Sequence, residues 1–112
     1  MKKFSVNVDV TEDTIIDMFI TACEGGSNYW CKELTPLGKS KDAYRAMLKG
    51  FTLVDLIDGR KYTVSEQRIE KAITKMALQE PRHFRDMVAE EGDACTADVF
   101  LQLCVFDKVI YG

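Results

Sequence analysis

The chain of 112 residues has a single histidine, His83, and none of its four cysteines forms a C-x-x-C pair. Structural zinc sites need closely spaced cysteine and histidine ligands, so we predict no metal site. Cys95 and Cys104 are separated by nine positions, and at about 100° per residue this spacing places them on opposite faces of one helix. The pattern therefore favours free, buried thiols in a reducing compartment.

Long apolar runs and basic clusters are also absent. The most apolar stretch, residues 94–106, is interrupted by Asp98 and is shorter than the roughly 20 residues of a membrane helix. The opening residues alternate in polarity, unlike the continuous apolar core of a signal peptide. The net charge is −3 and the lysines and arginines are scattered, whereas nucleic-acid binding needs a clustered basic surface. We expect a cytoplasmic protein that binds neither membranes nor nucleic acids directly.

The motifs of nucleotide hydrolysis and nucleophilic catalysis are incomplete. Gly38-Lys39-Ser40 is similar to the end of a phosphate-binding loop, but Glu33 stands where that motif needs another glycine. Gly25-Gly26 follows the negative C-terminal end of a predicted helix, whereas phosphates bind at the positive N-terminus. A nucleophile also needs a nearby base, and His83 has no companion in the sequence. We expect no cofactor, and no enzyme unless the fold brings His83 or a cysteine to a base.

Periodicity predicts most of the secondary structure. Apolar residues alternate with polar ones from Phe4 to Val10, the period of a half-buried strand. Helical spacing predicts amphipathic helices at residues 12–24, 42–49, 65–79 and 82–91. Thr11 is suited to cap the first of these helices, and Gly25 to end it. From Val99 to Phe106 the chain is apolar all round apart from Gln102, so this last helix must be covered on nearly every side.

Two further strands complete the predicted fold. Residues 28–34 form one of them, and Asp58-Gly59 predicts a hairpin between residues 51–57 and 61–64. With Asp58 and Gly59 as a two-residue loop, Leu53 lies opposite Val64, and the inward face carries Leu53, Ile57, Tyr62 and Val64. The order of elements predicts a single α+β domain over residues 1–112, with an antiparallel sheet of three to four strands and helices packed on one face.

Candidate binding residues gather around CEGGSNYWC, residues 23–31, and on the last helix. Tyr29 and Trp30 carry large amphipathic area suited to an interface or to stacking on a planar ligand, although a strand residue such as Trp30 can also face the core. Asp98 and Gln102 share one stripe of the apolar helix, where a carboxylate is costly unless it is paired. They either bind a ligand or hydrogen-bond the backbone of the corner at residues 25–28. If a pocket exists, we expect it along this seam, among Gly25, Gly26, Ser27, Asn28, Tyr29, Trp30, Asp98, Gln102 and Tyr111.

Two segments of the chain resemble a known group of proteins. The run EGGSNYWC at residues 24–31 and the ending TADVFLQ at residues 96–102 with VIYG at residues 109–112 resemble a family of small uncharacterised proteins encoded by bacteriophages and prophages. In that family a glycine commonly stands where this chain has Asp107. The resemblance implies a viral or proviral gene that acts inside a bacterial cell, and it implies no activity for particular residues.

Two hypotheses of function follow. In the first, the protein is a non-enzymatic inhibitor that occludes a host protein, and its acidic surface suits a basic, nucleic-acid-handling target such as a defence effector. In the second, it is a homo-oligomer that sequesters a signalling nucleotide. Tyr29 or Trp30 would stack on the base, while Asp98 and Gln102 would bind its polar edges.

Overall fold

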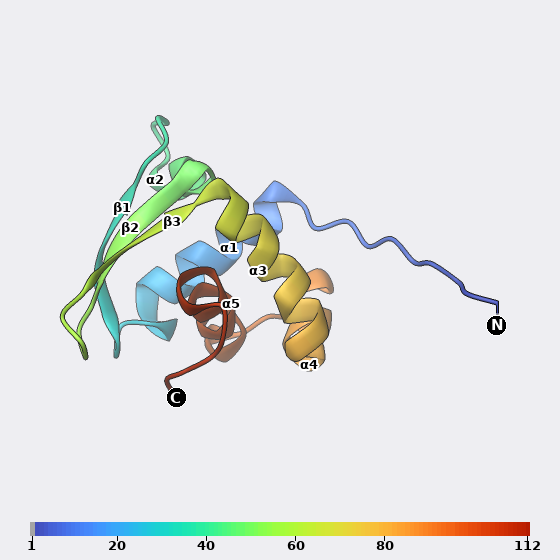
Figure 1. The fold of residues 1–112 in the computed structure, drawn as a ribbon. Coiled ribbons are helices and arrows are strands. Elements are labelled where there is room, and N and C mark those ends of the chain that lie inside the picture. Colours follow the sequence, from blue (N-terminus) through green and yellow to red (C-terminus); the bar gives the residue numbers. More distant parts are fainter. Residues whose placement is uncertain (1) are drawn as a thin grey trace.

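A three-stranded antiparallel sheet forms one layer of the structure, a computed structural model that describes residues 2–112. The strands are β1 (Cys31–Pro36), β2 (Gly50–Asp55) and β3 (Lys61–Ser65), in the spatial order β1-β2-β3. The helices lie on one face of this sheet (Figure 1). The predicted α+β architecture is therefore confirmed, with three strands in the sheet.

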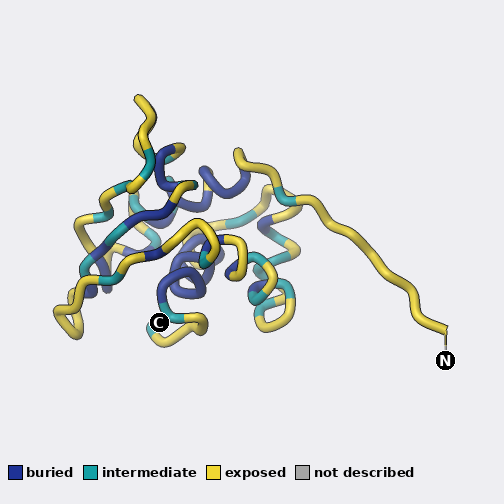
Figure 2. Tube along the Cα trace, turned by 45° about the horizontal axis from the view of Figure 1, so that its top comes forward, coloured by how far each residue is buried: buried dark blue, intermediate teal, exposed yellow. Residues whose placement is uncertain are grey.

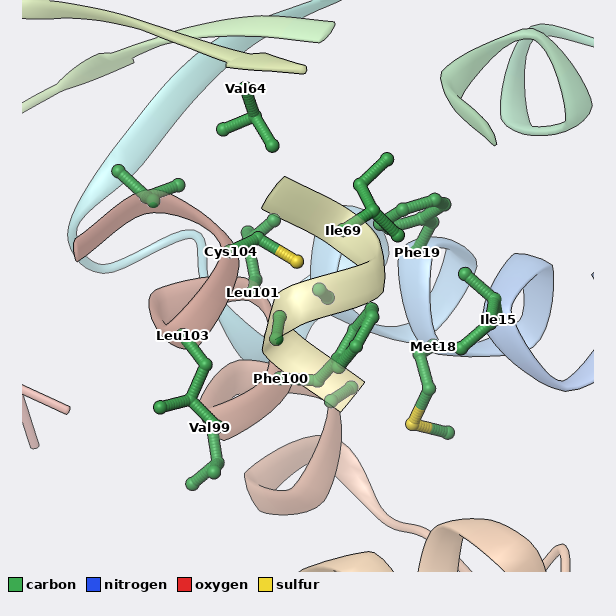
Figure 3. Close-up of a cluster of buried hydrophobic side chains, with 14 of the residues drawn as sticks. Ile15, Met18, Phe19, Val64, Ile69, Val99, Phe100, Leu101, Leu103 and Cys104 are labelled. Atoms are coloured by element: carbon green, nitrogen blue, oxygen red, sulfur yellow. The ribbon is translucent and has the colours of Figure 1, made fainter. Parts of the chain in front are cut away.

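The helical layer is built around α5 (Ala94–Phe106), whose apolar surface is buried on nearly all sides, as its sequence predicts. Phe100, Leu101 and Leu103 are fully buried, and the Phe100 ring lies 5.9 Å from that of Phe19 (Figure 3). The contacts to α5 come from neighbouring helices and from β3. The other helical elements are α1 (Glu12–Thr21), the π-turn η1 (Ala22–Gly26), α2 (Ala43–Ala46), the 3-10 turn η2 (Met47–Lys49), α3 (Glu66–Gln79) and α4 (Pro81–Val88).

Helix ends follow local chemistry. Thr11 caps α1 by accepting a hydrogen bond from the Thr14 amide at 3.2 Å, as predicted. Gly26 lies so close to α5 that a Cβ atom there would stand 2.6 Å from the Ala94 carbonyl oxygen, so glycine is required for this approach. Asp107 ends α5 in the left-handed conformation, with φ of 63°. Over residues 2–112, no helix combines the length and apolar character that crossing a bilayer requires.

The strand predicted at residues 4–10 is wrong for this chain. The segment extends away from the domain without a strand beside it (Figures 1 and 2). Phe4 and Val6 are each 83% exposed and Val8 is 51% exposed, and only Val10 packs against the core. Alternation shows that a segment is suited to a sheet, but the strand forms only where a neighbour supplies hydrogen bonds.

The hairpin is confirmed, but its predicted register is wrong. Leu53 pairs with Tyr62 and Phe51 with Val64, so the loop is longer than two residues. Asp55 stabilises this wider loop because its Oδ1 accepts hydrogen bonds from the amides of Ile57 at 2.8 Å and Asp58 at 3.4 Å. Ile57, predicted to face inward, therefore lies in the loop and is 60% exposed, while Phe51 and Leu53 of β2 are fully buried.

The strand predicted at residues 28–34 begins later, at Cys31. The residues before it form a turn in which the Trp30 and Cys31 amides both donate to the Ser27 carbonyl oxygen at 3.1 Å. The pairing of β1 with β2 shifts between Lys32 and Thr35, and Glu33 in this bulge has a φ of 57°. The bulge interrupts β1, an edge strand of the sheet.

Candidate functional site

Asp98 lies at the centre of a buried polar cluster. Its Oδ1 accepts hydrogen bonds from the Ser27 hydroxyl and from the indole nitrogen of Trp30, each at 2.7 Å. Its Oδ2 accepts one from the Gln102 amide at 3.1 Å and one from the Tyr29 hydroxyl. Burial and the Asp98 carboxylate raise the pKa of Tyr29 well above its usual value, so this hydroxyl stays a donor.

Gln102 fastens the C-terminal segment to α5. Its side-chain oxygen accepts hydrogen bonds from the amides of Ile110 and Tyr111, both at 2.9 Å, and its nitrogen donates to the Tyr111 carbonyl at 3.1 Å. The Tyr111 hydroxyl in turn donates to Asp55 at 2.6 Å. This hydrogen bond raises the pKa of Tyr111 to about 12. One polar network therefore joins α5, the turn before β1, the C-terminal segment and the hairpin.

The structure brings six of the nine candidate residues into this network, which holds Ser27, Tyr29, Trp30, Asp98, Gln102 and Tyr111. Gly25 and Gly26 form the turn beside it, and Asn28 faces away. Trp30 is fully buried and packs on Phe106 and Tyr111, with ring centroids 5.3 and 5.7 Å apart. Within residues 2–112, every buried side-chain nitrogen and oxygen has a hydrogen-bond partner. These polar atoms hold the fold together.

A hollow lies on the other side of the same motif. It has a volume of about 560 Å³ and opens between β1, η1 and α2. The motif CEGGSNYWC therefore contributes to two places. Its side chains Ser27, Tyr29 and Trp30 join the polar network, while this hollow is lined by Cys23, Asn28 and Cys31. The remaining lining residues are Lys32, Glu33, Leu34, Pro36, Ala43, Tyr44, Met47 and Leu56. We call it the β1 groove.

The β1 groove runs along the edge of β1 that lies away from β2. Four consecutive residues, Cys31 to Leu34, line it, where the bulge at Glu33 interrupts the alternation of side chains along the strand. The Cys31 amide at this end of β1 already donates to the Ser27 carbonyl oxygen. On this edge β1 has no neighbouring strand, because β2 pairs with its other side. Leu34, Tyr44 and Met47 meet only through packing of α2 and η2 against β1, so no local pattern predicted this groove.

The thiols of the β1 groove are poor nucleophiles. Burial raises the pKa of Cys23 to about 11 and that of Cys31 to about 12. Both thiols are protonated at neutral pH, and the Cys31 thiol donates to the Ser27 carbonyl oxygen at 3.4 Å. A nucleophilic cysteine needs a lowered pKa, which neither of these two thiols has.

His83 does meet a thiol, away from the β1 groove. Its Nε2 lies 3.9 Å from the exposed Cys95 sulfur, and its Nδ1 lies 2.9 Å from the Thr96 hydroxyl. Thr96 also contacts Asp93, the N-cap of α5, at 3.2 Å. The pairing arises because α4 packs against the start of α5, which no local sequence signal indicated. Neither His83 nor Cys95 lines the β1 groove.

No protein-family model, curated protein or solved structure matches the chain. Within residues 2–112, no group of three or more histidine, cysteine, aspartate or glutamate side chains is arranged to hold a metal ion.

Proposed function

We propose that this protein is a non-enzymatic binding protein that holds an extended segment of a target protein along the β1 groove. The observation that carries the proposal is the combination of a free strand edge with a hollow of about 560 Å³ beside it. Extended peptides bind such edges by adding a strand: main-chain hydrogen bonds give affinity, and pockets for alternate side chains give specificity. The β1 groove offers both.

The lining of the groove sets the chemistry of the bound segment. Leu34, Tyr44 and Met47 supply apolar surface, while Asn28 and Lys32 supply polar groups at the rim. Alternate apolar side chains of the bound segment would enter the groove, and the intervening polar ones would face water. The net charge of −3 favours a basic target through long-range attraction.

The resemblance to bacteriophage and prophage proteins supports a target in the bacterial host. A small protein that occupies a segment of a host protein inhibits it by occlusion and needs no catalytic group. A basic, nucleic-acid-handling defence effector fits both this origin and the charge of the chain.

Capture of a partner from bacterial lysate tests the proposal, with two variants on one strand. Leu34 is half-buried in the β1 groove, whereas the next residue, Thr35, is exposed and does not line it. We expect the natural chain and Thr35→Asp to retain the same partner and Leu34→Asp to lose it. Circular dichroism verifies that both variants fold. A partner held equally by Leu34→Asp, or none held by the folded natural chain, contradicts the proposal.

Thermal unfolding with added nucleotides distinguishes the alternative function, sequestering of a nucleotide, from binding of a protein segment. A ligand that binds only the folded state raises the melting temperature by mass action. Trp30 has no exposed face for stacking, and the polar atoms of Asp98 and Gln102 are already hydrogen-bonded. We therefore expect no shift with a panel of nucleotides, and a saturable shift would favour the second function.

A further inference from the structure

The chain carries a strand-like segment without a partner as well as a strand edge without a partner. Residues 4–10, which we call the arm, alternate apolar and polar side chains, and Phe4 and Val6 are each 83% exposed. Apolar residues of this kind in a regular alternation indicate a segment made to be covered. The β1 groove lies beside a strand edge that could pair with such a segment.

We propose that the arm of one molecule adds as a fourth strand to β1 of a second copy, so that two copies form a dimer by reciprocal exchange. This inference rests on the proposed function, because it names an occupant of the same groove. The lengths agree: at about 3.3 Å per residue, the seven residues of the arm span about 23 Å and the six of β1 about 20 Å.

The arm projects away from the groove of its own molecule. Val10 packs against the core, and Val6 and Val8 border a shallow hollow with Ile73 and Leu78 of α3. From there the arm extends away from the side that carries β1 in both views (Figures 1 and 2). A second copy can therefore bind this projecting arm. In a dimer with a two-fold axis, the arm of each molecule would lie in the β1 groove of the other.

Side-chain chemistry fits the exchange. In the arm, Phe4, Val6 and Val8 share one side, which would cover the apolar lining of the groove, and the polar residues between them would face water. The sheet is antiparallel, and an antiparallel arm would bring Asp9 towards Lys32 at the start of β1. Opposite charges on neighbouring strands stabilise such a pairing.

Exchange also implies competition. An arm in the groove covers the edge that the target segment would use, so the dimer is a resting form. The target would displace the arm, and removing the arm would leave the groove free. Both processes involve the same main-chain hydrogen bonds of β1.

Light scattering after size-exclusion chromatography measures the exchange in matched variants. Val6→Asp and Asn7→Asp add the same charge to opposite sides of the arm. Along a dilution series we expect the natural chain and Asn7→Asp to have twice the monomer mass of 12.7 kDa. Val6→Asp, and the chain shortened to residues 11–112, should be monomers. The shortened chain keeps the buried core, since Phe4, Val6 and Val8 are exposed and only the partly buried Val10 is lost from the residues packed against it.

NMR locates the bound arm. A synthetic peptide of residues 2–11, added to ¹⁵N-labelled chain 11–112, should shift the amide signals of Asn28, Lys32 and Leu34, and the same peptide with Val6→Asp should not. Shifts confined to α3 and α4 would overturn the exchange, as would a dimer that survives removal of the arm.

The two proposals fail separately. A monomeric natural chain whose lysate partner is lost in Leu34→Asp overturns the exchange and leaves the proposed function standing. An arm-dependent dimer that captures no host protein, even as chain 11–112, supports the exchange and counts against host binding.

Discussion

The carboxylate of Asp98 on α5 lies 2.7 Å from the indole nitrogen of Trp30, and this contact joins residues 68 positions apart. Both side chains are buried, and the same carboxylate accepts from three other side chains. A buried carboxylate with four donors is well compensated for its loss of water, whereas loss of either oxygen leaves the two donors that face it without an acceptor.

Asp98→Asn should destabilise the protein by about 2 to 4 kcal/mol, because an amide nitrogen would replace one of the two acceptor oxygens. The indole nitrogen of Trp30 can only donate, so the asparagine oxygen must face Trp30 and its nitrogen then faces the side-chain nitrogen of Gln102, another donor. Urea unfolding followed by Trp30 fluorescence measures the free energy of unfolding. Asp17→Asn, on the exposed face of α1, serves as the control and should change it by less than about 0.5 kcal/mol. Equal stability of the two variants would show that the network contributes little.

Asp107→Ala should cost about 1 kcal/mol, because alanine lacks the local hydrogen bonding that helps aspartate adopt the left-handed conformation. It also loses the ion pairs to Arg68 at 3.4 Å and Lys75 at 3.3 Å, which are weak because they are exposed to solvent. Asp107→Gly loses the same pairs but adopts a φ of 63° without strain, so we expect it to be close to the natural stability. Thermal unfolding compares the two variants. If glycine were as damaging as alanine, the ion pairs would be the larger contribution.

Alkaline pH should weaken the fold through Cys31. Burial raises the pKa of this thiol from 9.0 to about 12, so the unfolded chain releases the proton first. The stabilisation is complete below pH 9 and is lost as the pH rises from 9 towards 12. Urea unfolding along this range should give a shallower decline for Cys31→Ala than for the natural chain. Cys95→Ala, which removes an exposed thiol, should decline like the natural chain.

Cys95 should react first with iodoacetamide, because it is the exposed cysteine of the four. Cys31 and Cys104 are buried with raised pKa values and should react only when the chain unfolds. Mass spectrometry of digested samples along a time course identifies the order.

His83→Gln tests whether the imidazole near Cys95 activates that thiol. We expect the rate of alkylation to change little, since exposure of the thiol governs the reaction. A strong decrease across the neutral pH range would instead identify a working thiol–imidazole pair and would argue for catalysis.

Local sequence signals predicted the helices of this protein better than its strands. Thr11 starts α1, as predicted, because its hydroxyl accepts an amide hydrogen bond three residues later, and Ser65 starts α3 in the same way. The apolar surface of α5 required burial on nearly every side. Asp98 and Gln102 stood out because polar groups on such a helix need partners.

The atoms that these residues contact depend on the packing of distant segments. Asp98 meets the corner predicted for it, but through side chains of that turn and not through its backbone. Gln102 instead binds the backbone of the C-terminal segment, which no local pattern indicated. Alternation in residues 4–10 predicted a strand, but pairing depends on a neighbour, and the arm has none within its own molecule. The β1 groove arises only where α2 packs beside an unpaired edge, a relation between segments that no periodicity records.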